Sequence, residues 1–188
     1  MIYFTSDWHL GEDRIGINGK PNLFYRPFNS IDQQDNTIIS NFISKFKDGD
    51  TLYHLGDVLI NDIYCGEKYL KLLKFLYPNS EFNLILGNYD VDHVDILSKY
   101  FNVRNDATLD LSFGLCYLNH YPTKTLNDLQ DAQLGITGHI HSLWKVQKEL
   151  INVGVDAWNY MPVSIDEIEF CYNAMQNHYD NDVFVYTN

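Results

Sequence analysis

Two pairs of side chains that commonly bind metal ions occur in the sequence, each with its members two residues apart. Asp7 and His9 form the first pair, and His139 and His141 form the second. On an extended strand, side chains two residues apart point to the same face, so each pair can direct its donor atoms at one point. Three further oxygen or nitrogen donors follow apolar runs elsewhere in the chain: Asp57, Asn88 and His120.

These seven side chains offer only carboxylate, amide and imidazole donors, which suit divalent metal ions. Seven ligands are too many for one ion, so the sequence predicts a dinuclear site in which Asp57 bridges the two ions. Taken alone, Asp57 could cap a helix and Asn88 could be an ordinary turn residue. Their shared position at the ends of apolar runs favours metal binding.

The same residues lie in five short motifs that resemble those of the calcineurin-like metallophosphoesterase superfamily. In chain order the motifs are Asp7-Trp8-His9, Gly56-Asp57, Gly87-Asn88-Tyr89-Asp90, Asn119-His120 and Gly138-His139-Ile140-His141. Two flanking segments are similar to the small bacterial and phage members of this family: Arg26-Pro27-Phe28 and Asn152-Val153-Gly154-Val155-Asp156.

The resemblance implies an α/β fold in which a two-sheet β-sandwich is flanked by helices, in four α/β/β/α layers. It implies that Asp7, His9 and His141 hold one metal ion, that Asn88, His120 and His139 hold the other, and that Asp57 is shared. It also implies hydrolysis of a phosphoester by a hydroxide that bridges the ions. Mn²⁺ is the expected ion, with Fe²⁺, Ni²⁺ or Zn²⁺ as alternatives, because the ligand types do not choose among them.

Tyr89 departs from the family pattern, in which a histidine commonly occupies this position and acts as the acid. A tyrosine with a pKa of about 10 is a poor acid at neutral pH, whereas imidazolium with a pKa of about 6.5 is well suited. Substrates with good leaving groups, such as activated or cyclic phosphodiesters, are therefore expected to be favoured over alkyl monoesters. His93 is a second candidate for the acid, or else a solvent-facing helix residue.

The expected catalytic residues are Asp57, Asn88, Tyr89 and Asp90, and the expected substrate contacts are Asn88 and Arg26. For Arg26 two roles remain open: binding a substrate phosphate, or pairing with a carboxylate such as Asp156. Two other functions also remain open. One is a phosphomonoesterase that acts on nucleotides or phosphoproteins, and the other is a non-catalytic interaction module on the same fold.

The elements that position these residues are predicted from apolar runs and their periodicity. Short buried strands are expected at 2–4, 51–55, 82–86, 115–118 and 134–137, each ending just before a candidate ligand. Helices are expected from Ser30 to about residue 47, at 66–77, at 91–100 and from Ser164 to about His178. The long segment 10–29 is expected to be a functional loop.

The 188 residues are expected to form one domain, with 179–188 as a tail or an added edge strand. The net charge of −12 argues against non-specific binding to duplex nucleic acid, so the expected partner is a small phosphoester substrate such as a nucleotide. The three cysteines lack any C-x-x-C spacing, which is typical of reduced thiols in a cytoplasm. No segment predicts a membrane span or a secretion signal, and cytoplasmic localisation is expected.

Overall fold

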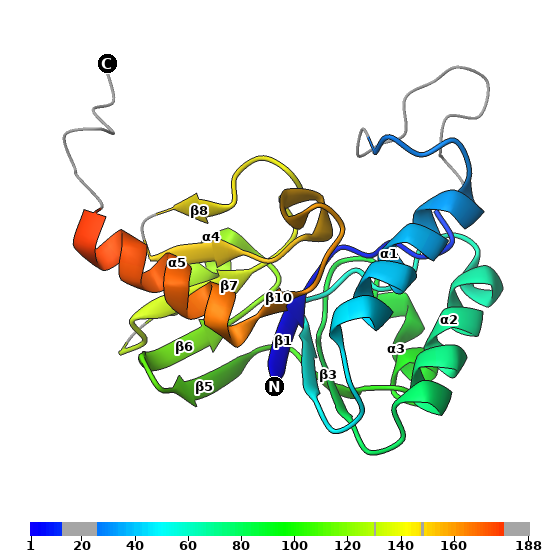
Figure 1. The fold of residues 1–188 in the computed structure, drawn as a ribbon, viewed down its shortest axis with the longest axis horizontal. Helices are drawn as coiled ribbons and strands as arrows, with labels where there is room; N and C mark the ends of the chain where they lie inside the picture. The colour runs from blue at the N-terminus through cyan, green and yellow to red at the C-terminus, as the bar shows by residue number, and fades with distance from the viewer. Residues whose placement is uncertain (13–25, 130, 148, 179–188) are drawn as a thin grey trace.

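The structure is a computed structural model that describes residues 1–12, 26–129, 131–147 and 149–178. It contains two five-stranded sheets with helices packed against them (Figure 1). The expected two-sheet α/β architecture is confirmed. Most of the predicted loop at 10–29 and the whole of the predicted tail at 179–188 lie outside the described residues.

The first sheet has the strand order β10-β1-β2-β3-β4, with β1 to β4 parallel and β10 antiparallel to β1. Its strands are β1 Ile2–Thr5, β2 Thr51–His54, β3 Glu81–Ile85, β4 Asn102–Arg104 and β10 Val163–Ser164. The parallel strands that lead to the site are short and apolar, as expected for strands covered on both faces.

The second sheet has the order β5-β6-β7-β9-β8 and is parallel in its centre. Its strands are β5 Ala107–Leu111, β6 Gly114–Leu118, β7 Leu134–Thr137, β8 Val146–Gln147 and β9 Leu150–Asn152. Every residue of β7 is buried. The apolar core that joins the two sheets includes Phe4 of β1 and Leu55, directly after β2, with Leu118 of β6 and Ile136 of β7.

The helices are α1 Ile31–Lys45, α2 Ile63–Leu76, α3 Val94–Leu97, α4 Pro122–Asn127 and α5 Ile165–His178, with 3₁₀ turns η2 at Val91–His93 and η3 at Val155–Trp158. Helices α1 and α2 pack their apolar faces on the first sheet. Ser30 caps α1 by accepting a hydrogen bond from the backbone N–H of Gln33. Ser164 and Glu167 exchange hydrogen bonds at the start of α5, which makes the predicted capping box.

Two helix predictions are corrected. Helix α2 begins at Ile63 rather than at Gly66, because Asp62 caps it by accepting a hydrogen bond from the N–H of Cys65. The segment predicted as one helix over 91–100 is divided into η2 and the single turn α3.

The five predicted strands are present with ends shifted by one residue at most, and each delivers its candidate ligand at its carboxyl end. Cys65, Cys116 and Cys171 form no disulfide. In the described part of the chain, no helix combines the length and the apolar character that crossing a membrane requires.

Candidate metal centre

The seven candidate ligands lie together where the two sheets meet. Asp7 and His9 follow β1, Asp57 follows β2 and Asn88 follows β3; His120 follows β6, and His139 and His141 follow β7. Hydrogen bonds connect the sheets here: the N–H of His139 donates to both oxygens of the Asp7 carboxylate, at 3.1 and 3.2 Å, and His120 Nδ1 donates to the Leu55 carbonyl at 2.6 Å. The parallel strands of both sheets therefore deliver their polar ends to one place.

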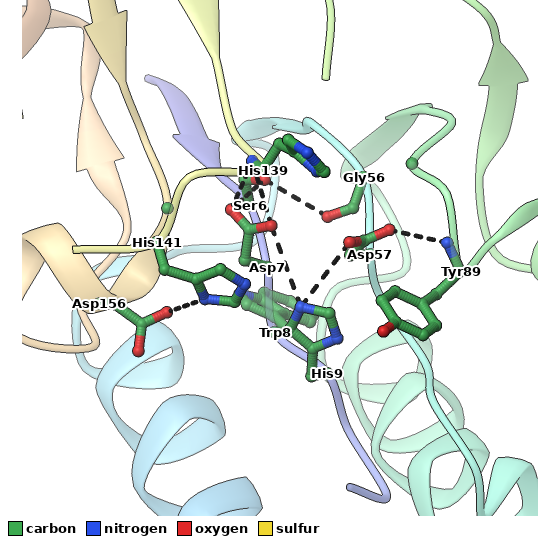
Figure 2. Close-up of polar contacts among 12 residues, drawn as sticks. Ser6, Asp7, Trp8, His9, Gly56, Asp57, Tyr89, His139, His141 and Asp156 are labelled. Atoms are coloured by element: carbon green, nitrogen blue, oxygen red, sulfur yellow. Dashed lines mark hydrogen bonds and ion pairs between the residues drawn. The ribbon is translucent and has the colours of Figure 1, made fainter. Parts of the chain in front are cut away.

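The ligands form two triads, and in each triad one donor atom from every residue lies within 4.8 Å of the others. The triads are Asp7, His9 and His141, and Asp57, His120 and His139. Asp57 Oδ2 lies 3.7 Å from His9 Nε2 in the first triad and 3.4 Å from His120 Nε2 in its own triad. Figure 2 shows the Asp57 carboxylate next to His9, with Asp7 and His141 on the other side of the imidazole. One carboxylate thus connects the two triads.

Asn88 adds its amide to the second triad. Its Oδ1 lies 3.2 Å from His120 Nε2 and 3.1 Å from His139 Nδ1. The structure therefore brings all seven sequence-predicted ligands into one cluster, with Asn88 exposed to solvent at its edge.

The backbone at the ligands differs from the extended geometry expected from the two-residue spacing. β1 ends at Thr5 and β7 ends at Thr137, so both pairs lie beyond their strands. Left-handed φ values occur at five of the ligands, namely Asp7 (59°), His9 (49°), Asp57 (61°), His139 (72°) and His141 (50°). Non-glycine residues in this region are strained, and such strain is found at functional sites. Sharp turns after the strands, rather than the pleating of the strands, bring the ligand side chains together.

Two of the imidazoles are oriented by hydrogen bonds at Nδ1. His120 donates to the Leu55 carbonyl, and His141 donates to Asp156 Oδ2 at 2.7 Å (Figure 2). Because these hydrogen bonds occupy Nδ1, Nε2 is the nitrogen of each ring that is left to bind a metal ion, which is the arrangement expected of metal-binding histidines.

Asp90 is buried and binds backbone rather than facing the cluster. Its Oδ2 accepts hydrogen bonds from the N–H groups of Asp57 at 2.7 Å and Gly87 at 2.9 Å, and its Oδ1 accepts from Val58 at 2.9 Å. Burial, and next the negative charge of Asp57, raise the pKa of Asp90 to about 6. These contacts support a role for Asp90 in positioning Asp57.

The electrostatics of the cluster favour cations. Burial raises the pKa of Asp7 and lowers the pKa of His9 well below its usual value. Burial also opposes protonation of His120, but the hydrogen bond and charge of Asp57 and the charge of Asp7 outweigh it and raise the pKa to about 9. Two buried carboxylates among four imidazoles and an amide form a donor set that fits two divalent ions.

Arg26 lies behind the first triad with a fully buried side chain. Its Nε and Nη2 donate to the two Asp156 oxygens at 2.8 and 2.9 Å, its Nη1 donates to the Trp8 carbonyl at 2.9 Å, and its Nη2 also donates to the Asp7 carbonyl. Of the two roles set out for Arg26, the structure shows the ion pair with Asp156. Contact between Arg26 and a substrate phosphate stays a prediction.

The two candidate acids have different positions. Tyr89 is partly buried beside the first triad: its ring centroid lies 5.3 Å from that of His9, and its N–H donates to Asp57 Oδ1 at 3.0 Å. His93 is the last residue of η2 and is half-buried.

Sequence reasoning missed the contacts that three supporting residues make with the ligands. Ser6 donates to Asp7 Oδ2 at 2.8 Å, Asn152 donates to the His141 carbonyl at 2.7 Å, and Asp156 accepts from His141. The N-V-G-V-D segment contains two of these residues, but nothing in its spacing indicates that they meet His141. Ser6 precedes Asp7 directly and carries no distinguishing pattern.

Comparisons with known proteins show the family to which the chain belongs. The model of the calcineurin-like phosphoesterase family matches residues 1–185, and the chain belongs to this family. An uncharacterized protein of Methanocaldococcus jannaschii is 27% identical over 177 residues, which cover 89% of this chain and 88% of that protein. The crystal structure of a protein of unknown function from Aquifex aeolicus aligns with a TM-score of 0.72 and 26% identity over 90% of this chain and 98% of that one.

Proposed function

We propose that this member of the phosphoesterase family is a phosphodiesterase that uses two divalent metal ions. The observation that supports a pair of ions is the position of Asp57 Oδ2, 3.7 Å from His9 Nε2 and 3.4 Å from His120 Nε2. A carboxylate shared between two histidine-containing triads is what a bridging ligand requires.

Asp7, His9 and His141 would hold one ion, Asn88, His120 and His139 the other, and Asp57 both. When bound, such ions activate water for attack on phosphorus and neutralise the charge that develops on the phosphoryl group. We propose Mn²⁺ as the ion, in keeping with an all-oxygen-and-nitrogen donor set and with the expected cytoplasmic location.

The side chains of the chain itself orient the reacting groups. Asn88 lies exposed at the edge of the second triad, where its amide can also contact a substrate oxygen. Asp90 holds the backbone N–H groups of Asp57 and Gly87, and so fixes the shared carboxylate in place. Rigid placement of this kind lowers the reorganisation needed in the transition state.

Tyr89 is the reason for preferring a diester. Its phenol can donate a hydrogen bond to a leaving oxygen, but an alkoxide leaving group needs a full proton, and a phenol with a pKa of about 10 is a poor source of it at neutral pH. A diester whose leaving group departs with little protonation avoids this requirement.

The substrate preference is measured with bis-p-nitrophenyl phosphate and p-nitrophenyl phosphate in parallel, with Mn²⁺-loaded protein. We expect a higher kcat/KM for the diester. A large preference for the monoester would contradict the diesterase proposal and favour the phosphomonoesterase, and hydrolysis of neither ester would favour the interaction module.

Replacement of the shared carboxylate tests the paired-ion arrangement. We expect Asp57→Asn to lower kcat for the diester by roughly 10²-fold or more, because the amide removes the charge that both ions share. Asp110→Asn, at an exposed position of β5, makes the same chemical change away from the site and should leave kcat unchanged. Hydrolysis by Asp57→Asn at the parental rate would show that Asp57 does not bridge.

A further inference from the structure

A groove of about 500 Å³ lies beside the metal centre, between α4 and the segment that follows β7. His139 belongs both to the second triad and to the wall of this groove. Tyr121, which directly follows the ligand His120, forms part of the same wall, and its ring centroid lies 4.9 Å from that of His139. The groove therefore borders the place where a phosphoryl group would lie.

The wall of the groove is mainly aromatic and aliphatic, with a few polar side chains. Its apolar members include Tyr121, Ile140, Trp144 and Leu150, and its polar members include Lys124 and Gln147. The Lys124 ammonium lies 4.7 Å from the centroid of the Tyr121 ring. This size and this mixture of apolar surface with a few polar groups are typical of a small-molecule pocket.

We propose that this groove binds the nucleobase of a nucleoside phosphodiester, an inference that rests on the proposed diesterase function. Nucleobases are planar and stack on aromatic rings such as those of Tyr121 and Trp144. Their polar edges need hydrogen-bond partners, which Lys124 and Gln147 supply. A simple alkyl ester group offers neither a face to stack nor an edge to pair.

The charge of the protein limits the size of this substrate. The net charge of −12 repels a long polyanion. A single phosphodiester has only one negative charge, and two bound divalent ions would make the site itself more positive. The groove therefore points to a mononucleoside or dinucleoside ester rather than to a nucleic acid strand.

The test is binding without turnover, measured by calorimetry on Mn²⁺-loaded protein. One probe is the non-hydrolysable phosphonate analogue of adenosine 5′-monophosphate, which mimics the nucleotide released when a nucleoside diester is hydrolysed. The other is methylphosphonate, which shares the phosphonate group and lacks the nucleoside. We expect the nucleoside analogue to bind at least 10-fold more tightly, and Trp144→Ala to lower its affinity about 10-fold, within the range found for base stacking. Methylphosphonate affinity should stay within about twofold of its wild-type value.

Two further variants make the result specific. Trp144→Phe retains a ring for stacking and should keep most of the affinity for the nucleoside analogue. Leu143→Ala changes the neighbouring side chain, which is 80% exposed and is not part of the groove wall, and should leave both affinities unchanged.

Equal wild-type affinities for the two phosphonates would overturn the nucleobase assignment. So would a parallel loss of both affinities in Trp144→Ala, because that pattern indicates damage to the metal centre. The binding measurement needs no hydrolysis, so the two proposals can fail separately. If the protein hydrolysed no ester but bound the nucleoside analogue tightly through Trp144, the result would support the nucleobase groove and contradict only the diesterase function.

Discussion

At the scale of single residues, Asp156 connects the ligand His141 to the buried Arg26. One of its oxygens accepts from His141 Nδ1 at 2.7 Å, and both accept from Arg26. Burial alone would raise the pKa of Asp156, but the hydrogen bond with His141 and the charge and hydrogen bonds of Arg26 outweigh it and lower the pKa to about 2. Asp156 therefore stays ionised and holds His141 with Nε2 facing the first triad.

We expect Asp156→Asn to weaken metal binding about 10- to 100-fold, because loss of the partner of a metal-binding histidine has effects of this size. The affinity is measured by titration of metal-free protein with Mn²⁺. Asp110→Asn, which is exposed on β5, is the matched control. An unchanged Mn²⁺ affinity in folded Asp156→Asn would rule out this positioning role.

At the scale of elements, the loops after β2 and β3 approach so closely that both have a glycine at the contact, Gly56 and Gly87. A Cβ atom at Gly87 would lie 2.6 Å from the backbone nitrogen of Asp57 and closer still to its carboxylate. This contact involves backbone that Asp90 already fixes, so a side chain at Gly87 must displace Asp57.

Gly87→Ala is expected to destabilise the protein by about 1–3 kcal/mol and to weaken Mn²⁺ binding, because the shared carboxylate moves. Urea denaturation and Mn²⁺ titration measure the two effects. Gly49→Ala is the control: no atom lies within 4 Å of its Cβ position, although its φ of +92° costs about 1 kcal/mol for alanine. If Gly87→Ala bound Mn²⁺ as tightly as Gly49→Ala does, the close approach would not matter for the site.

At the scale of the whole molecule, buried carboxylates make stability depend on pH. Asp35 on α1 is 1% exposed, and its Oδ2 accepts from the N–H of Gly11 at 3.1 Å while its Oδ1 has no hydrogen-bond partner among the described residues. Burial raises the pKa of Asp35 to about 6. The folded protein thus holds this proton more tightly than the unfolded chain, so the stabilisation is complete below about pH 4 and is lost as the pH rises through 6.

We expect the metal-free protein to lose stability between pH 4 and pH 7, and Asp35→Asn to reduce this loss by roughly 2–3 kcal/mol, as a pKa change from 3.8 to about 6 implies. Urea denaturation across this range measures it. Asp32→Asn changes a carboxylate on the same helix with 77% side-chain exposure and should alter the pH dependence little. An identical pH profile for Asp35→Asn and the wild type would contradict the assignment.

Several features of this protein follow from the sequence alone. Apolar runs of three to five residues predict buried strands, and β1, β2, β3, β6 and β7 confirm them, because a strand covered on both faces consists mostly of apolar residues. Other strands escaped prediction. β5 has five residues, but the exposed Thr108 and Asp110 interrupt its apolar run. β10 has two residues and β9 has three, and such segments become strands only through the neighbours with which they pair.

The candidate site divides in the same way. Residue type and order along the chain indicate which side chains can bind metal, since a donor atom is a property of the residue itself. The left-handed backbone at Asp7 and His141, the contact of Asp156 with His141 and the groove beside His139 depend on segments far apart in sequence. Only the packing of the two sheets brings those segments together, so only the tertiary structure could decide them.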